Sequence, residues 1–271
     1  MDTTLYEEWL LGRGLDPSSV YVYRGKLVAA SRIAAESGWD LRRMTASQLG
    51  SLASRFPDSH SSRSMLRFAL VHYWDMCGVE NPADAITTPK PPPARYRGLS
   101  DDDANRLESQ AAGVWPAGTV VMLGLYLALR RSEMASLRWD NFTPDLTEAR
   151  IVGKGRRTRF LPVHSNLRGE LASRMCDGYV FPGQAGRAFV HTGTVRAWIG
   201  SMAESVGLTI TNPHALRYTC ATRLYEETAD IHLVQEFLGH SDPKTTARYL
   251  TRVREERMRA AVQSLNYRRA A

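Results

Sequence analysis

Long apolar runs are missing from this sequence of 271 residues. The longest one, residues 120–129, is far shorter than the roughly 20 apolar residues that a membrane-spanning helix needs. The acidic start MDTTLYEEWL also lacks the basic and apolar regions of a secretory signal. We therefore expect a cytoplasmic protein.

Cysteine is scarce as well. Cys77, Cys176 and Cys220 lie far apart, and no CxxC motif or cluster of histidines accompanies them. This spacing predicts buried, reduced thiols and no metal site. The GxxxxGK[ST] motif is absent too, so the phosphate-binding loop of P-loop proteins is excluded.

Lysine is rare, with four lysines against 31 arginines, yet the chain is basic. Its net charge of +7 and its pI of about 9.5 make a polyanionic partner possible. Residues 1–90 hold ten basic and ten acidic side chains, whereas residues 91–271 hold 25 and 18. The excess positive charge therefore belongs to the second part of the chain.

A proline-rich stretch, TTPKPPPAR, interrupts the helical pattern. Closely spaced prolines exclude a helix and favour an extended, semi-rigid linker. We predict a helical domain at residues 1–88, a linker at 89–99 and a second domain at 100–271.

Apolar residues recur at helical spacing along most of both predicted domains. Four or five helices fit into the first domain, where Thr45 and Gln48 have the spacing of a capping box. The second domain opens with a helix capped at Ser100. In ARIVGKGRRTRFLPV the pattern changes to alternation of apolar and polar residues, which predicts two short strands and a tight turn. The predicted fold class is α+β, mainly helical with a small sheet.

The stretch TNPHALRY provides the first candidate site. Asn212 and Pro213 are favourable residues for a helix start. His214 and Arg217 then share one face of the first turns, where the helix dipole favours an anion such as phosphate. An ordinary surface pair has the same spacing, so this motif alone decides little.

A second candidate is LGHSDPKTTARY. Gly239 ends an apolar helix, His240 follows in the turn, and Asp242 and Pro243 start another helix. Tyr249 lies about 100° from the centre of the apolar stripe of that helix, so we expect it to be half-buried. A tyrosine at the rim of a core explains this position equally well.

Two further stretches are basic. Five of the ten residues 150–159 are basic, among them Lys154 between two glycines. A lysine in so arginine-rich a chain suggests a need for an amine that can release its proton, although a solvated hairpin tip gives the same pattern. Arg130 ends the apolar run and has a possible partner in Glu133.

Taken together, ALRRSEMASLRW, VGKGRRTRFLPV, HALRYTCATRL and LGHSDPKTTARY resemble, in order and spacing, the signature motifs of the tyrosine recombinase (phage integrase) family. The resemblance runs from about residue 99 to residue 251. The first domain resembles the all-α core-binding domain of that family, and the second its catalytic domain. Two positions depart from the pattern: Ala128 stands where glycine is more usual, and Tyr218 where histidine is.

The resemblance implies a role for each matching residue. The implied catalytic set consists of Arg130, Lys154, His214, Arg217, His240 and the nucleophile Tyr249, with Glu133 in a structural role. Attack of Tyr249 on a DNA phosphodiester would give a 3′-phosphotyrosyl bond and a free 5′-hydroxyl, with no metal or other cofactor. We further expect Arg156, Arg157 and Arg159, in the basic turn, to contact DNA.

The same resemblance implies the partners. We expect double-stranded DNA with short inverted core sites, a homotetramer on paired sites that is a monomer in free solution, and an accessory directionality factor. The helix after Tyr249 would then dock on a neighbouring protomer, or else on its own domain. Because the sequence starts almost directly with the expected core-binding helices, we expect no arm-binding domain.

Several functions share these motifs. A phage or prophage integrase that acts near the nucleoid of a bacterial host is our first expectation, and a Xer-type dimer resolvase or mobile-element recombinase is the alternative. A type IB topoisomerase-like enzyme would use the same chemistry without site specificity. A non-catalytic DNA-binding regulator would bind without cleavage.

Overall fold

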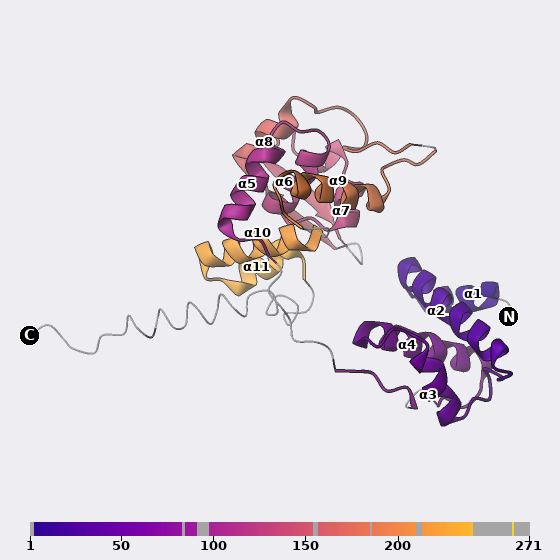
Figure 1. The fold of residues 1–271 in the computed structure, drawn as a ribbon. Coiled ribbons are helices and arrows are strands. Elements are labelled where there is room, and N and C mark those ends of the chain that lie inside the picture. The colour runs from indigo at the N-terminus through magenta and orange to yellow at the C-terminus, as the bar shows by residue number, and fades with distance from the viewer. Residues whose placement is uncertain are drawn as a thin grey trace, which may run out of the picture. The chain divides into compact units, whose positions relative to one another are not determined.

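The computed structural model describes residues 3–82, 85–90, 98–153, 157–184, 186–209, 213–240 and 262. The chain divides into two compact units, Met1–Pro93 and Ala94–Ala271. Helices dominate both units, and the strands of the described residues belong to the second one (Figure 1). The predicted α+β fold class, mainly helical with a small sheet, is confirmed.

The described part of the first unit contains four helices: α1 (Thr3–Gly12), α2 (Pro17–Glu36), α3 (Ala46–Ser54) and α4 (His60–Cys77). Side chains of Asp16, Thr45 and Ser59 cap the starts of α2, α3 and α4 by accepting backbone N–H bonds. The predicted capping box of Thr45 and Gln48 is present in both directions. Local sequence therefore sets three of the helix starts.

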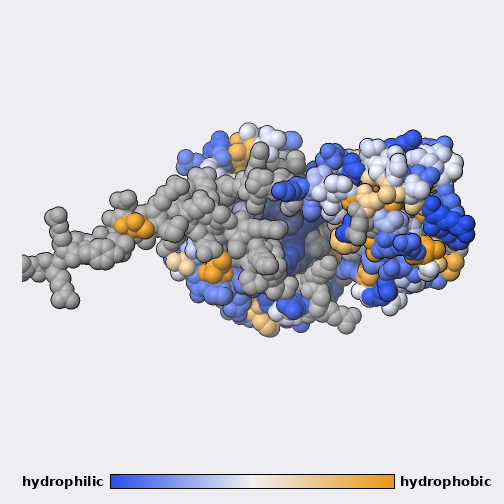
Figure 2. All heavy atoms as spheres, turned by 90° about the horizontal axis from the view of Figure 1, so that it is seen from below, coloured by the Kyte–Doolittle hydropathy of each residue, from blue (hydrophilic) through white to orange (hydrophobic). Residues whose placement is uncertain are grey.

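The core of this unit lies between α1, α2 and α4. Its largest aromatic side chains satisfy their polar atoms on the backbone: Trp74 Nε1 donates to Leu41 O over 2.8 Å, and Tyr6 Oη to Ala69 O over 2.7 Å. Hydrophobic residues also lie among hydrophilic ones on the surface (Figure 2). The large exposed ones in this unit are Leu5, Leu11, Tyr21, Val22, Val28 and Phe68.

The second unit contains seven helices among its described residues: α5 (Asp101–Ala111), α6 (Ala117–Leu127), α7 (Arg131–Ala135), α8 (Ser165–Ala172), α9 (Thr192–Ser205), α10 (Pro213–Thr228) and α11 (Ile231–Leu238). A short 3-10 helix, η2 (Trp139–Asn141), follows α7. Strands β1 (Glu148–Val152) and β2 (Thr158–Pro162) form the sheet. Ser100 caps α5 as predicted.

Helix α6 is the centre of the second unit, with α5, α8, α9 and α10 packed around it (Figure 1). It corresponds to the apolar run of the sequence, and Val120, Leu123 and Leu127 are completely buried. A helix that is apolar all round belongs in the interior rather than at a surface. Ala128 and Leu129, which follow the helix, are completely buried as well.

The two strands pair antiparallel, with Ile151 opposite Arg159 and Ala149 opposite Leu161. Buried and exposed residues alternate along both strands. Arg159 and Leu161 face inward, while Phe160 faces outward. The sheet thus directs one arginine into the protein.

The cysteines only partly match the expectation. Cys220 is buried, and burial raises the pKa of its thiol to about 12. Cys77 is partly buried, whereas Cys176 is exposed, so the prediction of a buried thiol is wrong there. Cys176 follows α8 in a loop, where chain connections run over the surface. In the part of the chain that the structure describes, no helix is long and apolar enough to cross a membrane.

Candidate active site

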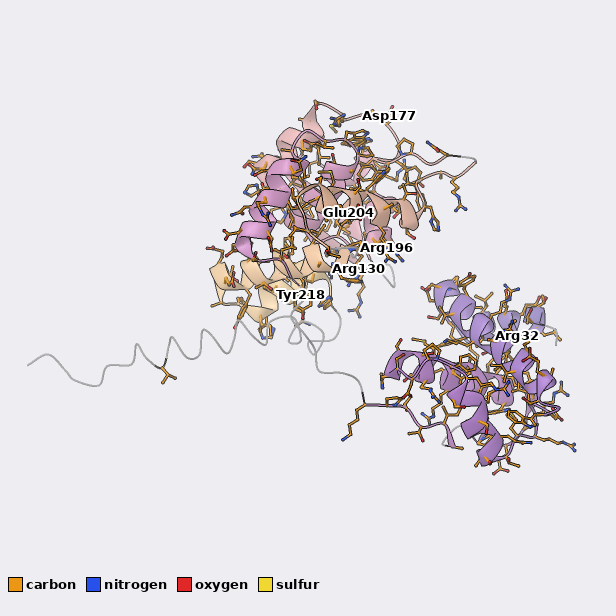
Figure 3. All side chains as sticks on the ribbon, in the orientation of Figure 1. Arg32, Arg130, Asp177, Arg196, Glu204 and Tyr218 are labelled. Carbon is orange, nitrogen blue, oxygen red and sulfur yellow. The ribbon has the colours of Figure 1, made fainter. Side chains whose placement is uncertain are left out.

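Arg130 lies where α6 has ended and α7 begins, at the edge of the unit (Figure 3). Its backbone N–H donates to Glu133 Oε2 over 2.8 Å, and its Nη1 donates to Glu133 Oε1 over 2.9 Å. The glutamate therefore caps α7 and holds the guanidinium of the residue that precedes the helix. The pairing of Arg130 with Glu133 suggested by the sequence is confirmed, and 28% of the arginine side chain remains exposed.

Glu133 also receives a second arginine. Arg159 donates from Nη1 to Oε1 over 3.1 Å and from Nη2 to Oε2 over 2.8 Å. Burial would raise the pKa of Glu133, but the hydrogen bonds and charge of Arg159, with a smaller contribution from Arg130, lower it to about 2. The carboxylate is ionised at neutral pH and each of its oxygens accepts two hydrogen bonds.

Arg159, expected among the DNA contacts, is turned into the unit instead. Only 8% of its side chain is exposed, and its guanidinium is bound to a buried carboxylate inside the unit. The reason is strand parity: Arg159 occupies an inward position of β2 together with Leu161. Arg157 lies before the strand and is exposed, so it stays a candidate for DNA contact. Arg156 lies outside the described residues.

Arg217 is buried on α10, with 1% of the residue exposed. Its Nη1 donates to Ala128 O, and its Nη2 donates to Leu238 O, each over 2.5 Å. These carbonyls stand at the ends of α6 and α11, where unsatisfied carbonyls and the helix dipole favour a cation. Two helix C-termini therefore hold this arginine in place.

His240 follows the left-handed Gly239 that ends α11, as predicted from the sequence. Its Nε2 lies 3.1 Å from Arg217 Nη2. Its backbone is fixed as well, because His240 N donates to Gln235 O and Gln235 Nε2 donates to His240 O. Burial, and then the positive charges of Arg217, Arg130 and Arg159, lower the pKa of His240 to about 4.

His214 stands in the first turn of α10 and is exposed, three residues before Arg217. Its pKa is lowered by partial burial, and then by the charges of Arg217, Arg130 and Arg131. Both histidines are therefore neutral near pH 7. A neutral imidazole can accept a proton, which is what a general base requires.

The separate elements meet at the end of α11. Arg130 Nη2 donates to Gly239 O over 3.3 Å, which joins the start of α7 to the turn that carries His240. Arg217 contacts the same turn from α10. Of the predicted catalytic residues, the structure thus connects Arg130, Arg217 and His240, with His214 one helical turn away. Lys154 and Tyr249 lie outside the described residues.

This arrangement suits an anion. Two guanidinium groups bind the carboxylate of Glu133, and a third, that of Arg217, contacts the turn that carries His240. The cluster therefore carries excess positive charge while both histidines are neutral. Arginines bind phosphate oxygens with two parallel N–H groups and offset charge that develops on them. In the described part of the chain, no group of three or more His, Cys, Asp or Glu side chains could hold a metal ion.

Comparison with known proteins adds independent findings. The model of the phage integrase family matches residues 100–256. Tyrosine recombinase XerA of Thermococcus kodakarensis is 31% identical over 269 residues, which cover 94% of this chain and 92% of that protein. Tyrosine recombinase XerC of Xanthomonas axonopodis pv. citri is 33% identical over 180 residues, or 62% of this chain and 58% of that protein.

A solved structure shows the same fold. The XerH site-specific recombinase, solved in a post-cleavage complex with its palindromic difH substrate, superposes with a TM-score of 0.70 at 16% identity over 92% of this chain and 80% of that chain. At such low identity the likeness concerns the fold alone. The family match covers more than half of the sequence. The chain therefore belongs to the phage integrase family of tyrosine recombinases.

Proposed function

We propose that this protein is a site-specific DNA recombinase that cuts and rejoins DNA through a covalent bond to Tyr249. The observation that carries the proposal is the cluster of Arg130, Arg217 and His240, joined through the last turn of α11. DNA as the substrate is supported by the relatives, which are named tyrosine recombinases, and by the XerH complex with its difH substrate.

The proposed first step is a transesterification. Tyr249 Oη bonds to the scissile phosphorus while the bond from phosphorus to the 5′-oxygen breaks, so a 3′-phosphotyrosyl ester and a 5′-hydroxyl result. His214 accepts the phenolic proton and Lys154 protonates the departing 5′-oxygen. The bond energy is kept in the ester, and attack by the 5′-hydroxyl of another strand completes the exchange through a Holliday junction.

The arginines stabilise the transition state. Arg130 and Arg217 bind the non-bridging oxygens, and neutral His240 donates one further hydrogen bond to them. An unperturbed tyrosine has a pKa near 10 and is a poor nucleophile at neutral pH, so its proton must be removed, and we assign that step to His214. We assign a supporting role to Glu133, because it holds Arg130 at the start of α7.

The first unit supplies DNA binding in this proposal. It is an independent helical unit with its own core, and we assign it the core-type DNA-binding role. The enzyme then binds short inverted core sites as a tetramer built from monomers, with exposed Arg157 among the phosphate contacts. Phosphate neutralisation by arginine makes such binding fall steeply with salt.

A nicked suicide substrate tests the chemistry. Loss of a short fragment after cleavage removes the 5′-hydroxyl, so the covalent adduct accumulates and runs as a shifted band in a denaturing gel. We expect an adduct with the wild type, none with Tyr249→Phe, and a normal amount with Tyr218→Phe, a matched change of another tyrosine. Absence of the wild-type adduct would make the protein a non-catalytic DNA-binding regulator.

Strand exchange then separates the recombinase from a topoisomerase. A recombinase forms products only from pairs of its own sites, whereas a type IB topoisomerase-like enzyme relaxes any supercoiled plasmid. Relaxation of plasmids of unrelated sequence, without exchange, would overturn the proposal in favour of the topoisomerase.

For the biological role, we propose integration and excision of a phage, and the names of the relatives favour Xer-type dimer resolution as a second candidate. Sequencing of recombinant junctions formed in a host distinguishes the two. Integration joins two different sequences that share a short core, whereas resolution joins two copies of one site. A requirement for a second protein in excision alone would identify a directionality factor.

A further inference from the structure

We propose that Arg159 is a positioning residue that keeps the positive charge of Arg130 available to the scissile phosphate and sets the spacing of the catalytic turns. The inference rests on the proposed function and adds a residue that acts through Arg130 and does not touch DNA. Three observations carry it: the saturated carboxylate of Glu133, the unequal exposure of the two arginines, and the glycines that lie against Arg159.

The first step concerns charge. Arg159 binds both oxygens of Glu133, whereas the side chain of Arg130 reaches only Oε1. One guanidinium neutralises the one negative charge of the carboxylate, so the trio carries a net charge of +1. Without Arg159, Glu133 and Arg130 would form a neutral pair. The attraction of Arg130 for a phosphate would then be much weaker.

The second step concerns access. The side chain of Arg159 is 8% exposed and that of Arg130 is 28% exposed, although both bind the same carboxylate. The two arginines therefore have different roles. Arg159 satisfies the buried anion from the inside, and Arg130 presents its charge at the surface of the site.

The third step concerns the glycines. A Cβ placed on Gly239 would lie 3.1 Å from Arg159 Cδ, and one placed on Gly153 would lie 3.4 Å from Arg159 Nη1. Gly239 precedes His240, and Gly153 precedes Lys154. The side chain of Arg159 thus fills the space where a side chain would stand at each of these two glycines, which precede predicted catalytic residues. It also binds the carboxylate that holds a third predicted catalytic residue, Arg130.

The ion pair of Arg159 with Glu133 is not the most stable arrangement for this buried position. Nε of Arg159 is buried and has no hydrogen-bond partner in the part of the chain that the structure describes. A buried donor without a partner is destabilising. A buried arginine–glutamate pair is also a weak stabiliser compared with apolar side chains of similar size. The planar guanidinium of Arg159, with its two parallel N–H donors, therefore fits a role in the geometry of the site.

The test measures two quantities: the single-turnover rate of adduct formation on the suicide substrate, and the affinity for DNA. We expect Arg159→Met to slow the adduct by about 100-fold, the usual effect of a catalytic group displaced by about 1 Å. DNA affinity should stay within about threefold of the wild type, because the weakened attraction concerns one phosphate among the many that a DNA-binding protein contacts. Arg106→Met is the matched control, since Arg106 forms an exposed pair with Asp103 in the same unit.

A double variant separates positioning from simple support of the fold. Glu133→Gln combined with Arg159→Met removes the charges of both residues. The positive charge of Arg130 is then no longer neutralised by a carboxylate, and the amide oxygen of the glutamine can still accept a hydrogen bond from Arg130. We expect the double variant to react at least tenfold faster than Arg159→Met alone. Arg159→Lys, which keeps the charge and loses the fork, should restore thermal stability but only part of the rate.

Four outcomes would overturn the inference, and the first three concern the rate. They are an Arg159→Met rate equal to that of the wild type, a loss of rate that follows the loss of DNA affinity, and a double variant that stays as slow as the single one. The fourth is unfolding of both Arg159→Met and the double variant, which would show that Arg159 and Glu133 serve only to stabilise the fold. Failure of the proposed function is distinct from all of these, because the wild type itself would then form no adduct.

Discussion

Arg217 donates a hydrogen bond from Nη2 to Nε2 of His240, and this contact determines the protonation state of the histidine. A guanidinium has only N–H donors, so Nε2 must be the acceptor and Nδ1 must carry the proton. A cationic imidazole has no acceptor and would face Arg217 with like charge. The buried arginine and the histidine of the α11 turn are therefore compatible only while His240 is neutral.

The pH dependence of stability follows from the burial of His240 and from the arginines around it. The pKa of His240 is about 4 in the folded protein, below its ordinary value of 6.5, so the unfolded chain binds the proton more readily. The stability contributed by neutral His240 is complete above pH 6.5 and is lost as the pH falls toward 4. His214 acts in the same direction, because its pKa is lowered as well.

His240→Gln isolates the contribution of His240, since glutamine does not titrate and its amide oxygen can still accept from Arg217. Urea unfolding at pH 7.5 and pH 5 should show a larger loss of stability in the wild type than in this variant. Equal losses in the two proteins would mean that burial and the neighbouring arginines do not lower the pKa of His240 in the folded protein.

Gly239 is predicted to tolerate no side chain. Its φ of +63° is unfavourable for other residues, and a Cβ would press on Arg159 at 3.1 Å. Gly239→Ala should therefore lose about 1 kcal/mol of stability from its backbone and, in addition, slow adduct formation by displacing the arginine.

Gly207→Ala is the matched control, because Gly207 has a φ of +72° in the same unit with no atom within 4 Å. It should lose similar stability and keep the wild-type rate. If the two alanine variants cleaved equally fast, contact between Gly239 and Arg159 would have no importance for the reaction.

Much of the fold was predictable because its signals are local. The capping box of Thr45, the cap at Ser100 and the helix end at Gly239 each depend on a few neighbouring residues, and all are present. The glycine-flanked turn between two alternating segments likewise predicted the hairpin. The pairing of Arg130 with Glu133 spans only three residues.

The rest of the site could not be predicted because it depends on tertiary contacts. The carbonyls of Ala128 and Leu238 that hold Arg217 come from two other helices, and no sequence pattern reports them. The burial of Arg159 had a signal that was missed. It shares its strand parity with Leu161, so strict alternation places it inside. A count of basic residues hides that parity and groups Arg159 with the expected DNA contacts.

Two alanines with left-handed backbones allow a paired stability prediction. Ala128 has a φ of 48° and Ala229 a φ of 55°. The methyl group of Ala128 is completely buried beside Cys220 and Leu238, whereas Ala229 is exposed. Glycine relieves about 1–2 kcal/mol of strain at either position and costs roughly 0.5–1 kcal/mol through the entropy of the unfolded chain.

Ala229→Gly should therefore raise the free energy of unfolding by about 0.5 kcal/mol, the difference of these two effects. Ala128→Gly also loses the burial of one methyl group, worth about 0.8 kcal/mol, and should be neutral or slightly destabilising. Urea denaturation of the two variants checks this order. A larger gain from Ala128→Gly would show that strain at the end of α6 outweighs packing of its methyl group.

The role proposed for Lys154 can be separated from mere phosphate binding by changing the leaving group. Sulfur in place of the bridging 5′-oxygen leaves as a thiolate, which needs no proton. Lys154→Ala should therefore slow adduct formation by 100-fold or more on the oxygen substrate, about the contribution of a general acid, and by little on the sulfur substrate. Arg130→Ala should be slow on both substrates, because loss of transition-state charge stabilisation does not depend on the leaving group. Equal defects of Lys154→Ala on the two substrates would assign that lysine to phosphate binding and would leave the proton donor to another group.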